Sequence, residues 1–440
     1  MRESIMVSPF RFGFFTNFGA DEWNGTFSNG GSPWTGEFHV EIAKALERAA
    51  FDFIFFDDNL LVPETYGNSM DAYLRLSATA PKHDPAPLAS LIGASTKDIG
   101  VVITLSTLAY PPYMLARLCA TLDHICRGRF GWNIVTSTEH GAAQNFGLDQ
   151  LPLRVDRYEV AEEYMDLVGQ LFRSWEPDAV VLDREKGIYA DASKVHAINF
   201  AGKHFKSRGP LNTVPSPQGR PAYFQAGASP VGRAFAAKYA DAVIVSAKGP
   251  AGMKAFRDDV RAKVAAAGRD PDSVKVFFLL APVLGATTSE ARAKHDRLRS
   301  SPFILERTLA FTSSISNIDF AQFDLDKPLP TLTTEGGSGT LEKIIQQSGG
   351  QGSDKTLREL AKIGMGNSVD LVGTPDEVAD EMVAIAEHVG GDGFLFTSPS
   401  QQVSRHYITE LTEGLAPALQ KRGLMRSAST PGTLRHKLQA

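Results

Sequence analysis

Polar side chains inside or just after short apolar runs are the first candidates for chemistry in this sequence. The run Phe130–Val135 is almost entirely apolar and too short for a helix, which predicts a strand buried on both faces. Asn133 interrupts that run with an amide, where a buried sheet would favour valine. Three hydroxyl residues, Thr136, Ser137 and Thr138, then close it. We therefore expect Asn133 and Ser137 to belong to a functional site.

Other predicted strands end in the same way. Polar or small residues occur at the ends of the apolar runs near 11–15, 53–56, 100–105 and 222–225: Asn17, Asp57, Asp58, Thr104, Ser106, Thr107, Gln225, Gly227 and Ser229. Because the carboxyl ends of barrel strands converge on one rim, these residues are expected to lie close together there. This set of strand-end residues contains no His-x-His pair, no His/Asp cluster for a metal and no G-x-S-x-G nucleophile motif. Amides and hydroxyls alone indicate that a cofactor supplies the reactivity, and we expect no metal.

The turn Gln225–Pro230 suggests which group that cofactor carries. A glycine and then Ser229-Pro230 precede a predicted helix, and free backbone N–H groups at a helix start can bind phosphate. Arg233 follows one turn later. Ser-Pro also starts helices with no ligand, as a plain N-cap, and this turn alone does not separate the two interpretations. Phosphates commonly bind at the later loops of a barrel, which favours the phosphate site.

The elements that would position these residues form a regular series. Eight predicted strands are each followed by a predicted helix, which indicates an α/β protein and favours a closed (β/α)8 TIM barrel. An open doubly wound sheet is the alternative, but the Gly-rich dinucleotide fingerprint expected after its first strand is missing. We expect one domain over residues 1–423, with insertions at about 176–215 and 301–368. The second insertion includes a Gly-rich tract, Gly336–Gly339, and 424–440 is predicted to be a polar tail.

Composition narrows the partners and the compartment. The 440 residues carry a net charge of −5 and no run of Lys and Arg, which argues against nucleic acid as a partner. No apolar stretch is long enough to cross a bilayer and no signal pattern starts the chain, so we expect a cytoplasmic protein without a membrane partner. Cys119 and Cys126 lie about 10 Å apart along one predicted helix, too far for a disulfide, and are expected in the core.

Several motifs, taken in chain order, resemble the bacterial-luciferase-like flavin monooxygenases. The resemblance runs from Phe12 to about Gly423 and is strongest to the branch containing nitrilotriacetate, dibenzothiophene-sulfone and streptogramin monooxygenases. The motifs that carry it are Ala50–Asp58, Tyr110–Tyr113, Thr121–Asp123, Gly128–Ser137, Asn145–Gly147, Arg157-Tyr158, Ser216–Gln218 and Gln225–Gly227.

This resemblance implies a two-component enzyme. A separate flavin reductase, which uses NAD(P)H, would deliver reduced FMN (FMNH2), and O2 would be the co-substrate. A flavin–oxygen adduct would then oxygenate a small organic molecule of aromatic, heterocyclic or sulfur-containing type. A homodimer or homotetramer is implied as well. Two alternatives stay open: an F420-dependent oxidoreductase and a non-catalytic flavin-binding protein.

The resemblance also assigns roles to single residues. Asn133 and Thr104 are expected to be catalytic, with Asn133 as an amide donor at the reacting edge of the flavin. The residues expected to bind the cofactor are Asp58, Thr104, Asn133, Ser137, Arg154, Tyr158, Gly227 and Ser229. Each also has a purely structural interpretation, such as a strand residue for Thr104 or a loop cap for Asp58.

Two departures from the family pattern matter. Arg154 stands where many relatives carry histidine, and its guanidinium could bind the FMN phosphate with two parallel N–H groups or could alter the pocket. Phe18 and Thr138 occupy places where the long-chain-alkane branch carries cysteine or histidine, which argues against alkane hydroxylation.

Overall fold

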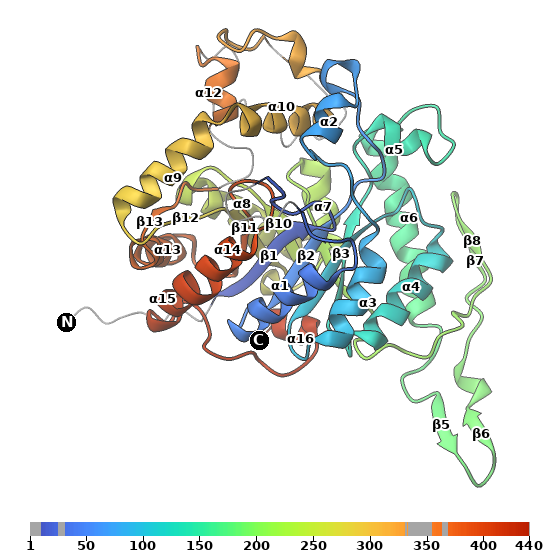
Figure 1. The fold of residues 1–440 in the computed structure, drawn as a ribbon. Coiled ribbons are helices and arrows are strands. Elements are labelled where there is room, and N and C mark those ends of the chain that lie inside the picture. Colours follow the sequence, from blue (N-terminus) through green and yellow to red (C-terminus); the bar gives the residue numbers. More distant parts are fainter. Residues whose placement is uncertain (1–9, 25–30, 331, 333–353, 363–367, 440) are drawn as a thin grey trace.

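The computed structural model describes residues 10–24, 31–330, 332, 354–362 and 368–439. Its centre is a closed barrel of parallel strands in the order β1-β14-β11-β10-β9-β4-β3-β2 (Figure 1). The strands are β1 Arg11–Asn17, β2 Phe53–Asp57, β3 Gly100–Ser106, β4 Phe130–Val135, β9 Ala222–Gln225, β10 Ala242–Val245, β11 Lys275–Leu280 and β14 Gly393–Phe396. The predicted (β/α)8 TIM barrel is therefore confirmed.

Helices surround this barrel in the expected alternation. They are α1 Glu37–Arg48, α3 Pro85–Ser95, α4 Pro112–Ile125, α6 Arg154–Phe172, α7 Pro230–Tyr239, α8 Gly249–Ala266, α13 Pro375–Val389, α14 Arg405–Thr409 and α15 Ala416–Lys421. Helix α13 shows how local sequence sets the boundaries. Thr374 and Glu377 form the predicted capping box at its start, and Gly390 ends it with a φ of 86°.

Strand β11 is shorter than the apolar run in which it lies. The apolar run 274–283 continues past Leu280, but β11 ends there and Val283–Leu284 form a separate strand, β12. Strand β12 pairs outside the barrel with β13, Val372–Gly373. Pro282 separates the two strands, and proline has no N–H to donate to a strand ladder.

Two excursions leave the barrel. Residues 180–207 form two antiparallel hairpins, β5 Val180–Asp183 with β6 Ile188–Ala190, and β7 Phe200–Ala201 with β8 Lys206–Ser207. The β5–β6 hairpin extends away from the barrel in Figure 1. The other excursion carries α9 Thr288–Ser300, α10 Pro302–Ser316 and α12 Leu357–Lys362 above the barrel (Figure 1). The Gly-rich tract Gly336–Gly339 lies outside the described residues.

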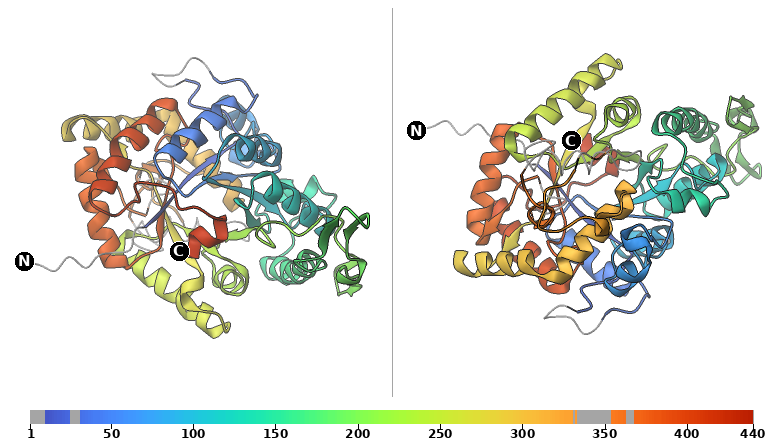
Figure 2. Two further views of the ribbon diagram at one scale, coloured as in Figure 1. Left: turned by 90° about the horizontal axis from the view of Figure 1, so that it is seen from below. Right: turned by 90° about the horizontal axis from the view of Figure 1, so that it is seen from above.

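The amino-terminal end of the barrel is filled by side chains. The rings of Phe53 and Phe224 lie 5.1 Å apart, and those of Phe53 and Phe277 lie 5.0 Å apart. Helix α16, Leu434–Gln439, covers this end of the barrel (Figure 2, left). Its Leu434 and Leu438 are fully buried in the same cluster, so a segment of polar composition carries a buried apolar face. The opposite rim is left to form a site.

Two further expectations concern the core and the membrane. Cys119 and Cys126 are both buried and free, as predicted. Within the described ranges, no helix combines the length and the apolar character needed to span a bilayer.

Candidate active site

A cavity of about 210 Å³ opens at the carboxyl ends of β2, β3, β4 and β9. Four of the predicted site residues line it: Asp58, Thr104, Ser137 and Tyr158. Asn133 is not a lining residue, but it is hydrogen-bonded to Thr104, which is one. Arg154, Gly227 and Ser229 are not among its lining residues. The barrel thus brings together residues that are up to 100 positions apart in the sequence.

Thr104 and Asn133 form a pair across β3 and β4. They are register partners in the two parallel strands, and Asn133 Nδ2 donates to Thr104 Oγ1 at 2.9 Å. Asn133 is 3% exposed, and its Oδ1 has no hydrogen-bond partner. Thr104 therefore takes one of the two Nδ2 hydrogens, and Asn133 keeps the second N–H as a donor and Oδ1 as an acceptor. The amide donor expected from the sequence stays a prediction.

Ser137 is held by a neighbouring strand end. Its hydroxyl lies 2.8 Å from Ser106 Oγ, and its backbone has a φ of 60°, which non-glycine residues seldom adopt. Both serines line the cavity. The turn after β4 therefore presents a pair of hydroxyl groups at the rim.

Tyr158 and Gln225 connect α6 to the end of β9. Gln225 Nε2 donates to the Tyr158 hydroxyl at 3.3 Å, while Gln225 Oε1 is buried without a partner. A Cβ on Gly227 would lie 2.4 Å from the Gln225 amide, so a larger residue there would have to displace that amide. Ser229 Oγ accepts from the Gly232 N–H at 3.2 Å and caps α7. The N-cap interpretation of Ser229 is confirmed, and its phosphate role stays a prediction.

Arg154 is the first residue of α6, one turn before Tyr158. Burial raises the pKa of Tyr158, and the positive charges of Arg157 and Arg154 oppose that rise. Arg154 thus contributes positive potential at the phenol, on the side of the cavity where the α7 turn lies.

Charged groups collect on the other side of the cavity. Lys82 Nζ lies 3.1 Å from Asp57 Oδ2, and the Lys82 side chain is 5% exposed. Burial raises the pKa of Asp58 to about 7, against the opposing effect of the Lys82 charge. Burial also raises the pKa of Glu139, whose carboxylate accepts from Thr138 Oγ1 at 3.0 Å and from Ser314 Oγ at 3.4 Å.

Sequence reasoning missed Lys82 and Glu139. Lys82 lies in an irregular segment between β2 and α3, and no local pattern marks it. Glu139 directly follows the hydroxyl run 136–138 at the end of β4, so extending that run by one residue would have found it.

The polar atoms of this cavity fit a reduced flavin. Four buried amide or carboxylate oxygens lack hydrogen-bond partners here: those of the lining residues Asp57, Asn59 and Gln225 (Oδ1, Oδ1 and Oε1), and Oδ1 of Asn133 beside the lining residue Thr104. Buried acceptors without partners are costly unless a ligand supplies donors, and a reduced isoalloxazine has N–H groups and a ribityl chain has hydroxyls. The hydroxyls of Ser106, Ser137 and Tyr158 can serve the same chain. No group of three His, Cys, Asp or Glu residues suited to a metal occurs in the described part of the chain.

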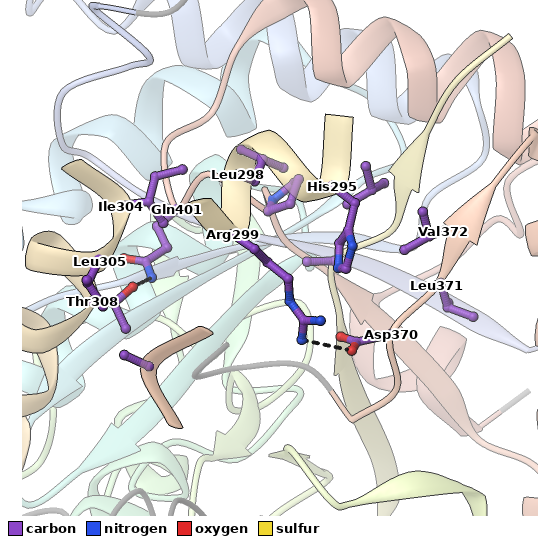
Figure 3. A pocket seen from close by; sticks show the side chains of 14 residues that line it. His295, Leu298, Arg299, Ile304, Leu305, Thr308, Asp370, Leu371, Val372 and Gln401 are labelled. Carbon is purple, nitrogen blue, oxygen red and sulfur yellow. Dashed lines mark hydrogen bonds and ion pairs between the residues drawn. The ribbon is translucent and has the colours of Figure 1, made fainter. Parts of the chain in front are cut away.

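A second, smaller cavity of about 90 Å³ lies on the other half of the rim, beside β12, α10 and the loop after β14 (Figure 3). Its polar side chains satisfy each other. Arg299 pairs with Asp370 at 3.3 Å, and Gln401 Nε2 donates to Thr308 Oγ1 at 3.1 Å, as the dashed lines in Figure 3 show. Among the described residues, none that lines this cavity has an unpartnered buried polar atom. The larger cavity is therefore the candidate active site.

The sequence is similar to known proteins over most of its length. A family pattern described as "Luciferase-like monooxygenase" matches residues 10–393. The dibenzothiophene-sulfone monooxygenase of Rhodococcus erythropolis is 36% identical over 411 residues, covering 92% of this chain and 90% of that protein. The dimethyl-sulfide monooxygenase of Hyphomicrobium sulfonivorans is 35% identical over 445 residues, covering 100% of this chain and 91% of that protein.

A solved structure resembles this fold closely. A riboflavin lyase crystallised with modified FMN and riboflavin superposes with a TM-score of 0.86 at 31% identity, covering 98% of this chain and 96% of the other. The predicted resemblance and the branch named for it are thus confirmed.

Proposed function

This chain belongs to the luciferase-like monooxygenase family and is a monooxygenase that uses reduced FMN and O2, and from that premise we propose that its substrate is a small sulfur-containing organic molecule. Reduced FMN comes from a separate flavin reductase and supplies the electrons that activate O2. The observation that carries the site assignment is the set of buried acceptors without partners, above all Asn133 Oδ1 and Gln225 Oε1, at one rim of the barrel.

The site residues expected from the sequence divide into two proposed roles. Thr104 and Asn133 would contact the reacting edge of the flavin as catalytic residues. The cofactor-binding residues would be Asp58, Ser137, Arg154, Tyr158, Gly227 and Ser229, together with Thr104 and Asn133. In this arrangement Tyr158 and Arg154 lie toward the phosphate end, beside the amino terminus of α7, because a helix start and a guanidinium both favour an anion.

Apolar side chains support a sulfur substrate over a polycarboxylate. Leu60, Ala142, Phe311 and Ile315 line the cavity together with the polar rim. An apolar wall desolvates a neutral sulfide or sulfone at little cost, whereas a multiply charged anion would lose its hydration there. The named substrates of the two relatives above, a sulfone and a sulfide, support the same class.

The test is a coupled assay with FMN, NADH and an added flavin reductase. Dibenzothiophene sulfone and dimethyl sulfide are the probes, and nitrilotriacetate is the charged contrast. We expect oxygenated product from a sulfur probe. Product from nitrilotriacetate alone would overturn the substrate class, and O2 uptake that never yields product from any probe would favour the flavin-binding alternative. An F420-dependent reaction is not favoured, because the relatives named above are monooxygenases and the similar solved structure holds a modified FMN.

Assembly and compartment extend the proposal. We propose a homodimer or homotetramer, because the β5–β6 hairpin exposes Val181, Leu182, Ile188 and Tyr189, and such apolar patches mark interfaces. Light scattering after size-exclusion chromatography tests this. We propose a cytoplasmic location, which the two free, buried cysteines support because reducing compartments keep thiols unpaired.

A further inference from the structure

Helix α10 crosses the mouth of the barrel from one side to the other. Its contacts reach the loop after β14 and the loop after β4. In the closed ring of strands, β14 and β4 are four places apart out of eight, so these loops lie on opposite sides of the rim. Figure 1 and the view from above in Figure 2 show α10 over the barrel.

Arg307, in the second turn of α10, fixes the amino-terminal half of the helix. Its Nη1 donates to the Ser400 carbonyl and its Nη2 to the Gln401 carbonyl, both at 3.1 Å. The residue is 6% exposed, and burial lowers its pKa to about 10. Burying a guanidinium costs free energy, which the two hydrogen bonds to these carbonyls offset in part, and the same bonds tie α10 to the loop after β14.

Asn317 fixes the other end. Its Nδ2 donates to the Thr138 carbonyl at 2.7 Å, beside the longer contact of 3.4 Å from Ser314 to Glu139. Asn317 ends α10 with a φ of 54°, a left-handed conformation that asparagine and glycine adopt at low cost. Asn317 therefore has two separable functions: its backbone ends the helix, and its side-chain amide holds the loop after β4.

Two residues of α10 between these two contacts line the active site. Phe311 and Ile315 follow Arg307 at helical spacings of four and eight, and both line the flavin cavity. Because the helix is held at both ends, these two apolar side chains stay at a fixed height over the rim.

We propose that Arg307 and Asn317 are positioning residues that hold Phe311 and Ile315 over the flavin site and so exclude water from it. The inference rests on the proposed function for its site. In coupled turnover, substrate, O2 and FMNH2 give oxygenated substrate, water and FMN. In uncoupled turnover, O2 and FMNH2 give FMN and hydrogen peroxide, with two electrons and two protons passing to O2. Access of water favours the second reaction, since a closed site suppresses such side reactions.

The test uses Asn317→Gly and Arg307→Met in the full chain. Glycine keeps the left-handed helix end and removes only the bond to Thr138, so Asn317→Gly is informative even if Arg307→Met fails to fold. The matched controls are Asn199→Gly, an exposed left-handed asparagine in the hairpins, and Arg297→Met, an exposed residue of α9.

Two readouts are needed. The first is iodide quenching of the fluorescence of bound oxidised FMN, which we expect to rise at least about threefold in the two test variants and in neither control. The second is hydrogen peroxide released per NADH with dibenzothiophene sulfone present, which we expect to rise in parallel. The FMN dissociation constant should stay within about twofold of wild type, because neither residue lines the flavin cavity.

Unchanged quenching in both test variants, or an equal rise in Asn199→Gly, would overturn the inference. The quenching measurement needs no substrate. A failure to oxygenate any sulfur probe would therefore count against the proposed function only, and not against the roles of Arg307 and Asn317.

Discussion

Asn133 Nδ2 lies 2.9 Å from Thr104 Oγ1 across two adjacent barrel strands, and this contact leaves Asn133 Oδ1 as the one amide atom without a partner. The contact fixes which way the amide faces, because the two residues are register partners on β4 and β3. A side chain held in this way needs no reorganisation to accept a hydrogen bond from a ligand.

The first prediction concerns this acceptor. Asn133→Ala should lower the yield of product per O2 consumed by about tenfold or more, because a fixed polar contact at the reacting edge is lost. The free energy of unfolding should fall by only about 1 kcal/mol for the lost bond to Thr104. Oxygen uptake with product analysis measures the first effect and urea unfolding the second. Thr121→Ala, at an exposed threonine of α4, is the control. An unchanged product yield would refute the role given to Asn133.

The second prediction is a pH dependence at Asp58. Its pKa is about 7 in the folded protein against an ordinary value of 3.8, so the folded state holds a proton that the unfolded state releases. The stability that this proton contributes is fully present below about pH 4 and is lost as the pH rises through about 7. Asparagine is neutral at all pH values. The flavin-free Asp58→Asn variant should therefore gain stability over wild type by on the order of 1–3 kcal/mol on going from pH 4 to pH 8.

Thermal unfolding of flavin-free protein across this range provides the measurement. Asp149→Asn, at an exposed aspartate, should show no such trend. If the stability difference between Asp58→Asn and wild type is the same at both ends of the range, Asp58 is not held protonated by burial.

The third prediction separates cofactor binding from helix stability. A Cβ on Gly232 would lie 2.9 Å from the Tyr158 hydroxyl and 3.1 Å from Ser229 Oγ, so Gly232→Ala should displace the phenol. We expect FMN to bind about tenfold more weakly, which corresponds to about 1.4 kcal/mol, while α7 remains folded. Gly252→Ala is the control. Gly252 lies inside α8, and a Cβ there would meet no atom outside the helix's own backbone nearer than 3.9 Å. The substitution should therefore add about 0.5–1 kcal/mol of stability without changing FMN affinity. Equal affinity in both variants would contradict the proposed phosphate end.

The fourth prediction concerns α16. Leu434 is fully buried against the barrel interior, and a Cβ on Gly100 would come within 2.7 Å of it. Leu434→Ala should lower the free energy of unfolding by about 2–5 kcal/mol through lost burial and the cavity left behind. Urea unfolding measures the loss, with Leu153→Ala, which is 60% exposed, expected to change it by less than about 0.5 kcal/mol. A loss no larger than that of Leu153→Ala would show that burial of Leu434 does not contribute to the stability of the barrel.

Local sequence predicted most of the scaffold. Buried parallel strands are short apolar runs, and caps such as Thr374 mark helix starts, so strand order and alternation could be read directly. Asn133 and Ser137 stood out for the same reason, because a polar residue in or after such a run is a local anomaly. Their convergence with Thr104 followed from the barrel itself, since parallel strands end on one rim.

The sequence by itself therefore determined the barrel, the family and the strand-end residues, whose signals depend on neighbours a few positions away. Only the tertiary structure decided that Asn133 is hydrogen-bonded to Thr104, that Lys82 and Glu139 line the site and how α10 is held across the mouth. It also decided that Leu434 of the polar carboxyl-terminal segment closes the barrel. Each of these depends on contacts between segments far apart in the chain, such as Asn317 with Thr138, and periodicity carries no information about such contacts.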